Sequence, residues 1–383
     1  MKQRVRPLFG TLMLVVAAAF VLSFRVSTRH GFNSFRLPND VVAARKPAAA
    51  MNETLLKLAA VDLGEAQWKQ EIEEMMEGNL PDRGRKRTYL SSGRVRIHHA
   101  RARSFRGIPV NVQSPQFYRL WLELRKILHG WWRNRRFQPD IMSDLVNLVR
   151  VPIDRESVKY SSCAVVGNSG ILLQKENGEL IDSHEAVIRL NNARTSGFER
   201  HVGSKTTISF INSNMLHLCA RREGCFCHPY GLTVPIVMYI CQPIHFFDYA
   251  LCNSSHRSPL VVTDLRFDLL CTRIVKYYSM KRFTEEGKRS VEEWGSAHGG
   301  PLFHYSSGMQ AVMLALGICD KVSIFGYGKS DSAKHHYHTN QKAELHLHDY
   351  EAEYDLYHDL VNRPQAIPFI LDKFKFPPVV IYQ

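Results

Sequence analysis

A short apolar run that stops at a pair of glycines limits how this chain can fold. The run is Cys163–Val166, and the motif GNSG follows it at residues 167–170. A short run of this kind that ends in glycine is typical of a buried parallel strand, because glycine lets the backbone turn sharply. The tips of such strands hold nucleotides in open α/β sheets, and Asn168, Ser169 and bare backbone N–H groups suit a ribose or a phosphate. An ordinary strand turn is the alternative, and this motif alone leaves it open.

Strand-like and helical runs alternate along the chain from about residue 151. Strands are expected at 162–166, 186–190, 206–211, 234–240, 259–263 and 321–326. Helices are expected between them, notably at 265–278 and 307–317. This alternation indicates an α/β sandwich with a largely parallel sheet, in one domain that is large enough to bury a core.

The first 24 residues have the composition of a membrane anchor. Lys2, Arg4 and Arg6 precede residues 8–24, a run of 17 residues without charge. The run is just long enough to span a bilayer, and the positive charges before it favour a cytoplasmic tail at residues 1–7 and a lumenal remainder. A cleaved signal peptide is the alternative, because three alanines in the run resemble a cleavage site. We expect a single-pass type II membrane protein.

The positive charge of the chain lies almost entirely in its first part. The net charge is +14, with 26 Lys and Arg against 12 Asp and Glu in residues 1–150, and 24 of each in residues 151–383. A nucleic-acid groove would place basic residues on the folded domain, so this distribution argues against nucleic acid as a partner. We expect a basic stem at 25–115 with one helix at 53–76, and a lumenal catalytic domain at 116–383. An amphipathic helix at 118–132 packs onto that domain.

All of the cysteines follow residue 160. They are Cys163, Cys219, Cys225, Cys227, Cys241, Cys252, Cys271 and Cys319. In a lumenal domain this even number favours disulfides. A zinc site at Cys225, Cys227 and His228 is the alternative, but no second cysteine pair stands at the spacing of a zinc finger. Asn52 and Asn253 begin N-glycosylation sequences, which are used only if the chain is lumenal.

Polar residues also mark other segments that we expect at the same edge of the sheet. Asn191 ends the second expected strand, so neighbouring parallel strands would bring its amide close to Asn168. Ser306 and Ser307, followed by Gly308, precede an apolar helical run, and a helix N-terminus with free N–H groups attracts anions. Plain turn asparagines and simple helix capping are the alternatives.

A cluster of histidines forms the last candidate site. Within fourteen residues the chain carries His335, His336, His338, His346 and His348. A zinc site is one alternative, although the spacing does not place three ligands on one helical face, and an exposed polar loop is another. A catalytic loop fits better, because one imidazole can act as the base for an acceptor hydroxyl while another supplies positive charge to a leaving phosphate.

The sequence Asp-x-Asp does not occur anywhere in the chain. Glycosyltransferases that hold a sugar diphosphate through a divalent metal commonly use such a carboxylate pair. A leaving group with one phosphate carries less charge, so histidines and backbone N–H groups can serve it. The missing motif therefore favours a nucleoside-monophosphate sugar as the donor.

Four stretches, taken in order, resemble the motifs of the eukaryotic sialyltransferase family of Golgi glycosyltransferases. Residues 163–211, with CAVVGNSG, RLNNARTSGFE and VGSKTT, resemble the large sialylmotif, and residues 305–328 resemble the small one. The sequence HHYH at 335–338 resembles the third motif, and His348–Glu353 resembles the very small motif, His-x4-Glu. The chain is most similar to the plant sialyltransferase-like branch of the family.

The resemblance implies roles for the matching residues. Those that match contacts to the donor nucleotide are Asn168, Ser169, Asn191, Ser306, Ser307 and Gly308. His336 matches a histidine that contacts the donor phosphate, and His348 matches the general base. Cys163 and Cys319 match a disulfide. The family fold is a variant nucleotide-binding sandwich, Rossmann-like and of GT-A type, and its reaction inverts configuration without a metal or another cofactor.

One role stays ambiguous, because His346 and Glu351 also satisfy His-x4-Glu. We prefer His348 as the base, since the following Asp349 matches the family. The resemblance then predicts a Golgi enzyme that transfers a sugar from a nucleotide-sugar donor to a glycan hydroxyl. The expected donor is CMP-sialic acid or a CMP-linked, Kdo-like keto-acid sugar. A galactosyltransferase that uses UDP-galactose is one alternative, and an inactive lumenal binding protein that retains the fold is another.

Overall fold

The computed structural model describes residues 51–79, 83–89, 95–101, 112–153, 159–215, 227–253, 257, 259–287, 289–300, 303–339 and 348–383. All of these residues belong to one compact unit, Ala50–Gln383, which is called the second unit because it follows residues 1–49. The predicted tail at 1–7 and anchor at 8–24 therefore lie outside the described residues. Within the described ranges, no helix is both long and apolar enough to cross a membrane.

A parallel sheet organises the second unit. Its strands are β3 (Cys163–Val166), β4 (Ala186–Leu190), β5 (Ile208–Asn212), β6 (Ile236–Tyr239), β7 (Leu260–Val262), β8 (Val322–Phe325) and β9 (Val379–Tyr382). They pair in the order β7-β6-β5-β4-β3-β8-β9, and every neighbouring pair is parallel. The predicted parallel α/β architecture is confirmed. The prediction did not include β9, although its four residues are all β-branched or aromatic.

The strand order reverses between β3 and β8. From β3 the chain builds outward to β7, and it then returns to add β8 and β9 on the other side of β3. The connections therefore leave the carboxyl ends of β3 and β8 in opposite directions, and we call the region beyond those ends the crevice. In open α/β sheets this switch point is where ligands bind.

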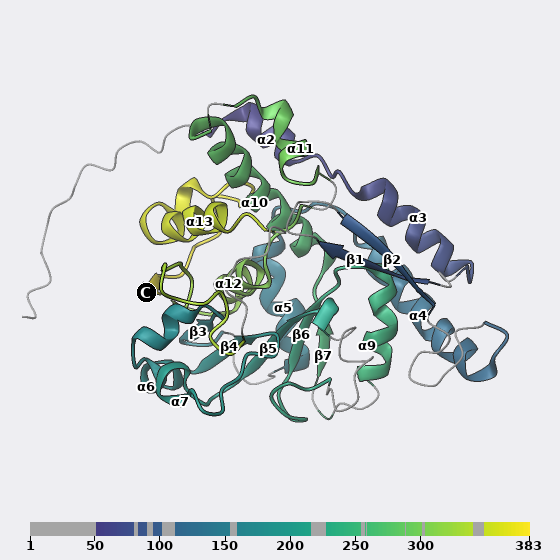
Figure 1. The fold of residues 1–383 in the computed structure, drawn as a ribbon, viewed down its shortest axis with the longest axis horizontal. Coiled ribbons are helices and arrows are strands. Elements are labelled where there is room, and N and C mark those ends of the chain that lie inside the picture. The colour runs from purple at the N-terminus through teal and green to yellow at the C-terminus, as the bar shows by residue number, and fades with distance from the viewer. Residues whose placement is uncertain are drawn as a thin grey trace, which may run out of the picture. The chain divides into compact units, whose positions relative to one another are not determined.

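Helices cover both faces of the sheet. The α-helices are α2 (Glu53–Ala59), α3 (Glu65–Met76), α4 (Pro115–Arg133), α5 (Ile141–Ile153), α6 (Gly178–Asp182), α7 (Glu199–Val202), α9 (Phe246–Asn253), α10 (Leu265–Glu285), α11 (Trp294–Ala297), α12 (Ser307–Ile318) and α13 (Tyr350–Asn362). Helices α10, α12 and α13 gather on one side of the strands (Figure 1). All twelve residues of α12 are buried, so this helix forms the centre of the main core.

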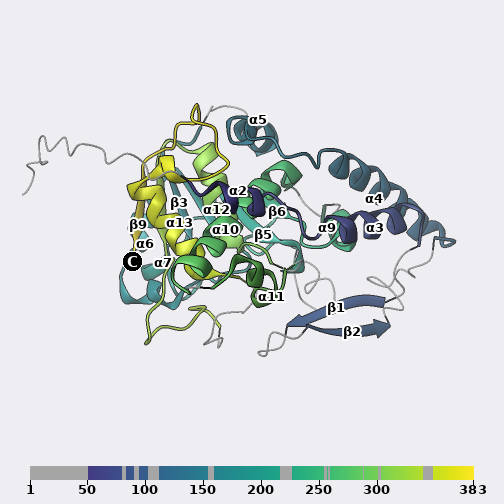
Figure 2. The same cartoon turned by 90° about the horizontal axis from the view of Figure 1, so that it is seen from above.

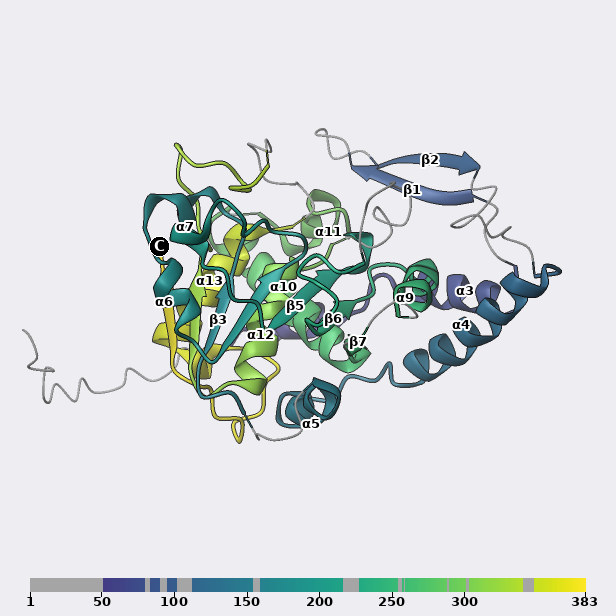
Figure 3. The same ribbon diagram turned by 90° about the horizontal axis from the view of Figure 1, so that it is seen from below.

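Alternate residues of each strand enter different cores, as the two-residue period of a strand requires. Val165 and Ile188 lie in the core that α10, α12 and α13 cover. Val166 and Val187 lie on the opposite face, in a smaller core with Ile181 of α6. Helices α6 and α7 lie near β3, on the side of the unit away from α4 (Figure 3). Because both faces are covered, β3, β4 and β8 are buried along their whole length, including the polar residues Arg189 of β4 and Ser323 of β8.

The predicted stem differs from the structure in one stretch. The single helix expected at 53–76 is two helices, α2 and α3, and both pack into the unit. Leu55 and Ala59 of α2 lie in the main core, and Trp121 of α4 donates a hydrogen bond of 2.9 Å to the carbonyl of Met75 in α3. Helices α3 and α4 run side by side (Figure 2). The folded unit therefore includes residues 51–79, ahead of the predicted boundary at 116.

A two-stranded antiparallel hairpin follows α3 within the predicted stem. It consists of β1 (Arg83–Tyr89) and β2 (Val95–Arg101), with Arg83 paired to Arg101. The prediction did not include this hairpin, although Val95 and Ile97 alternate with Arg96 and His98 in β2.

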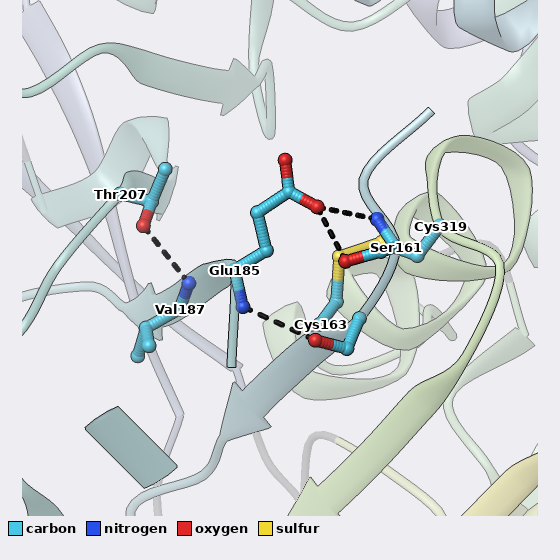
Figure 4. Close-up of a disulfide and its surroundings, with 7 residues drawn as sticks. Ser161, Cys163, Glu185, Val187, Thr207 and Cys319 are labelled. Atoms are coloured by element: carbon cyan, nitrogen blue, oxygen red, sulfur yellow. Dashed lines mark hydrogen bonds between the residues drawn. A yellow bond between two sulfur atoms is a disulfide. The ribbon is translucent and has the colours of Figure 1, made fainter. Parts of the chain in front are cut away.

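Two disulfides lie in the described residues. Cys163 is bonded to Cys319, the pairing that the resemblance implied (Figure 4). Cys163 begins β3 and Cys319 directly follows α12, so the bond joins the ends of these elements that face away from the strand tips. Cys227 is bonded to Cys252, so the sulfur of Cys227 is not available to the alternative zinc site. Cys225, the other cysteine of that site, lies outside the described residues.

Candidate active site

The candidate site lies at the carboxyl edge of the sheet, where the strand order reverses. The tips of β3 and β8 touch there: a Cβ atom on Gly167 would lie 2.6 Å from the carbonyl oxygen of Gly326. Only glycine fits such an approach. Gly326 itself has a φ of 75°, which favours glycine and turns the chain away from β8.

Asn168 and Ser169, which follow Gly167 at the tip of β3, make different contacts. The buried Oδ1 atom of Asn168 has no hydrogen-bond donor among the described residues. The hydroxyl of Ser169 donates to the carbonyl of Gly328 at 3.0 Å and accepts from the N–H of Ile171 at 3.3 Å. Asn168 therefore has an atom left for a ligand, whereas Ser169 ties the tip of β3 to that of β8.

Asn191 joins the next strand tips to the helix above them. It adopts a φ of 53°, which asparagine tolerates better than most residues, and its Oδ1 accepts from the N–H of Asn212 at 3.1 Å. Asn212 ends β5, and its Nδ2 donates to the hydroxyl of Ser307 at 3.0 Å. The carbonyl side of Asn191 is therefore occupied, and its Nδ2 remains as a donor for a ligand.

Ser306 is the N-cap of α12, as predicted. Its hydroxyl accepts from the N–H of Met309 at 3.1 Å and donates to Glu353 at 2.6 Å, while its backbone N–H donates to the same carboxylate at 2.6 Å. Tyr357 also donates to Glu353. Burial raises the pKa of Glu353 to about 7, against the effect of these hydrogen bonds. The very small motif thus holds the start of α12 through a buried carboxyl group.

Gly308 is required by Tyr327, which follows β8. A Cβ atom at position 308 would lie 2.9 Å from the Tyr327 ring, and the Tyr327 hydroxyl donates to the Gly308 carbonyl at 3.2 Å. The first turn of α12 can therefore lie directly over the tip of β8. Its free N–H groups supply partial positive charge at the crevice.

The third motif packs against the tip of β3. The N–H of Tyr337 donates to the Asn168 carbonyl at 2.9 Å, which places His336 and His338 beside that residue. Burial lowers the pKa of His336 to about 4, and His335 and His338 act in the same direction. His336 is therefore neutral near pH 7 in this structure. An anionic phosphate nearby would raise the pKa and favour the charged form that the sequence suggested.

His348 precedes α13, and one edge of its ring is fixed. Its Nδ1 lies 2.9 Å from the main-chain carbonyl oxygen of His304, so Nδ1 carries the proton and Nε2 carries the lone pair. Burial, and to a smaller extent the rings of His304 and His335, lowers the pKa of His348 to about 3. A neutral imidazole with a free lone pair is the form that a general base requires.

A chain of rings joins His348 to the third motif. The ring centroids of His348 and Tyr350 are 5.5 Å apart, those of Tyr350 and His335 are 5.3 Å apart, and those of His335 and His336 are 4.5 Å apart. The structure thus brings the two predicted catalytic histidines to one side of the crevice. His346, the alternative base, lies outside the described residues.

No group of three or more His, Cys, Asp or Glu side chains in the described ranges is arranged to hold a metal ion. The chemistry that the arrangement supports directly is proton removal by a neutral imidazole. The amide groups and the helix N-terminus beside that imidazole can bind an anionic, nucleotide-like group.

Three residues of the site were not predicted from the sequence. Asn212 is the last residue of a strand and Tyr327 follows one, so both lie at strand tips as Asn168 and Asn191 do, and this position was a usable signal. His304 has no such signal, because its role depends on His348, which lies 44 residues further along.

Comparison with known proteins identifies the family. The model of glycosyltransferase family 29, the sialyltransferases, matches residues 112–364. The chain belongs to glycosyltransferase family 29. A β-1,6-galactosyltransferase of Arabidopsis thaliana is 54% identical over 402 residues, covering all of both chains. Sialyltransferase-like protein 1 of rice (Oryza sativa subsp. japonica) is 49% identical over 403 residues, again covering all of both chains.

Animal members of family 29 are more distant. An α-2,3-sialyltransferase of Gallus gallus is 26% identical over 250 residues, which cover 62% of this chain and 66% of that protein. A crystal structure of a mammalian sialyltransferase overlaps with 70% of this chain and 85% of its own, at 24% identity and a TM-score of 0.38. The chain is thus a family 29 glycosyltransferase with near relatives of two different names.

Proposed function

We propose that this family 29 enzyme transfers galactose from UDP-galactose to a glycan hydroxyl, with inversion, and that His348 is the general base. The observation that carries the catalytic role is the hydrogen bond from Nδ1 of His348 to the carbonyl of His304, which leaves Nε2 unprotonated. The identity of 54% to a β-1,6-galactosyltransferase along the whole chain supports galactose as the sugar.

In the proposed reaction Nε2 of His348 takes the proton of the acceptor hydroxyl as its oxygen attacks the anomeric carbon. The new C–O bond forms on one face of the sugar while the bond to the phosphate oxygen breaks on the other. The electron pair of the broken C–O bond leaves with the nucleoside diphosphate, UDP. An α-linked donor then gives a β-linked product, in keeping with the linkage in the name of the Arabidopsis relative.

The crevice residues bind the donor in this proposal. The amides of Asn168 and Asn191 contact the nucleoside, together with the turn formed by Ser306, Ser307 and Gly308. Ser169 contributes by holding the tip of β3. The N-terminus of α12 and His336 face the phosphates, and His336 gains its proton when the donor binds. The reaction needs no metal in this account, and full activity in excess EDTA is the expected outcome.

A CMP-sugar, with sialic acid or a Kdo-like keto acid, is the second candidate donor. Two observations favour it: the similarity to animal sialyltransferases and the lack of an Asp-x-Asp sequence. We rank it second because those relatives are 26% identical to the chain over part of its length, whereas the galactosyltransferase is 54% identical over all of it.

The cellular setting is part of the proposal. Residues 8–24 anchor the enzyme in the Golgi membrane with its catalytic domain in the lumen, where the disulfides form and where Asn52 and Asn253 carry glycans. The fold is a GT-A type variant. An inactive binding protein remains the alternative of another class, and any catalysed sugar transfer rejects it.

A donor panel tests the proposal. The full chain is incubated with labelled UDP-galactose or CMP-sialic acid and a galactan or glycoprotein acceptor, and the thermal shifts with UDP and CMP are measured in parallel. We expect β-linked galactose in the product and stabilisation by UDP. Transfer from the CMP-sugar alone, with stabilisation by CMP and not UDP, would reject the galactosyltransferase in favour of the second candidate.

A further inference from the structure

The crevice contains a histidine that the proposed mechanism does not use. His304 lies two residues before the N-cap of α12, and its side chain is half-buried. Its ring centroid is 4.8 Å from that of His348, and the two planes meet at 84°. Its carbonyl oxygen accepts the Nδ1 proton of His348. Residue 304 thus contacts the base twice, through its main chain and through its side chain.

We propose that His304 is the positioning residue for the base. The carbonyl of residue 304 fixes the tautomer of His348, and the His304 ring fixes the plane of the imidazole so that Nε2 faces the acceptor hydroxyl. This inference rests on the proposed function, since it gives His304 a purpose only if His348 removes a proton. The placement of the two rings is an observation that holds without it.

The geometry explains why a carbonyl alone is not enough. A single hydrogen bond at Nδ1 tolerates a range of angles, so it leaves the ring able to rock about its Cβ–Cγ bond. A second ring placed edge to face against the first blocks this rotation, and edge-to-face pairs are a favoured arrangement. Tyr350 contacts His348 at 81° and a centroid distance of 5.5 Å, so rings from two elements hold the base in one plane.

The charge of His304 also bears on the base. The titratable groups around His348 are His304 before α12, His335 in the third-motif loop, and Tyr350 and Glu353 of α13. Asp349 is directed away, since its carboxylate accepts from Ser279 and lies 3.6 Å from His298. Glu353 is bound to Ser306. When His304 is protonated it opposes protonation of His348, which helps to keep Nε2 available in an acidic compartment.

Two substitutions separate the ring from its charge. His304→Phe keeps an edge-to-face ring without a titratable group, and His304→Ala removes the ring. His358→Phe is the matched control, because His358 is exposed on α13. In each full-length variant, imidazole ¹⁵N and ¹³C NMR signals follow the tautomer and titration of His348, which a His348→Gln spectrum assigns. Steady-state kinetics give kcat and the donor KM across pH.

We expect the pKa of His348 to rise toward its ordinary value in both His304 variants and to stay unchanged in His358→Phe. In His304→Ala we also expect kcat to fall by roughly tenfold or more, with the donor KM unchanged, because the base is misplaced and the nucleotide site is intact. His304→Phe should retain most of kcat at neutral pH.

The inference is overturned if His304→Ala lowers only thermal stability and leaves both the titration of His348 and kcat at their wild-type values. A different result tests the proposed function: if His348→Gln transfers sugar normally, His348 is not the base. The NMR titration still decides in that case whether His304 controls the state of the ring, so the two failures are distinguishable.

Discussion

At the scale of single residues, the site depends on buried carboxyl groups, whose ionised form is destabilised by burial. Glu353 is 1% exposed and binds both polar groups of Ser306, yet burial raises its pKa to about 7. Asp268 is also buried, and burial raises its pKa to about 7 although it accepts from Thr263 and Gln310. Carboxyl groups of this kind stabilise the fold while they are protonated and lose that contribution as pH rises through about 7.

Glu353→Gln tests this linkage. The pKa of Glu353 is higher in the folded chain than in the unfolded one, so its contribution to stability is complete below about pH 4.5 and is lost as pH approaches 7. The difference in the free energy of unfolding between wild type and Glu353→Gln should therefore be larger at pH 5 than at pH 7.5, by roughly 2–3 kcal/mol. Urea unfolding at the two pH values measures it. Equal differences at both would show that Glu353 is ionised throughout this range.

The histidines act in the opposite sense. Burial lowers the pKa values of His336 and His348 to about 4 and 3, so unfolding is favoured as pH falls from about 6.5 toward those values. Both histidines are present in wild type and in Glu353→Gln, so their contributions cancel when the two free energies of unfolding are subtracted.

Sequence reasoning found those site residues that lie in local motifs. Asn168, Asn191 and Ser306 each follow or precede a recognisable element, so their positions follow from the strand and helix pattern. Asn212 binds Ser307 across 95 residues, and no local pattern encodes that contact. Only the structure shows that Oδ1 of Asn168 has no hydrogen-bond partner among the described residues, whereas the Ser169 hydroxyl has two. In the sequence both residues are simply small and polar.

At the scale of elements, α2 shows how a segment of the predicted stem becomes part of the domain. Lys276 of α10 is buried and donates to the carbonyls of Leu58 and Val61 at 2.9 and 2.7 Å. These carbonyls belong to the end of α2, where helix carbonyls lack partners and cations are favourable. Burial lowers the pKa of Lys276 to about 8. The sequence did not predict this docking, because it joins positions more than 200 residues apart.

Lys276→Met should release α2. The substitution keeps the apolar stem and removes the ammonium group, so two carbonyls lose a charged donor, and we expect a loss of about 2–3 kcal/mol in the free energy of unfolding. Amide hydrogen exchange should increase first at residues 53–61. Lys281→Met, on the same helix, serves as the control. Unchanged exchange in α2 would mean that apolar packing alone holds the helix.

The β-strands show the opposite case, in which a local pattern is sufficient. Six strands were predicted within two residues of their observed ends, because each is a short apolar run between polar or glycine-bearing turns. Helices α5 and α13 were not singled out. The start of α13 carries Glu351 and Glu353 close to the histidine cluster, and acidic residues there do not indicate a helix while their partners are unknown.

At the scale of the whole molecule, the Cys163–Cys319 bond connects the two elements that carry most of the site. It closes a loop of 156 residues, at the edge of the sheet that faces away from the crevice. Replacing both cysteines by serine should lower the free energy of unfolding by about 2–5 kcal/mol. The donor KM should not change at temperatures where the variant is folded. Cys241→Ser, which removes a free thiol, is the control. An unchanged melting temperature in the double variant would contradict the expected stabilisation.

In the proposed mechanism one neutral imidazole, at the switch point of a parallel sheet, performs the proton transfer of a family 29 enzyme. The direct test is the transfer rate of His348→Ala in the full chain, with His358→Ala as the matched histidine control. We expect kcat to fall by roughly 10²–10⁴-fold in His348→Ala, nucleotide affinity measured by calorimetry to stay unchanged, and the control to behave as wild type. Sugar transfer by His348→Ala at a rate close to that of wild type would contradict this mechanism.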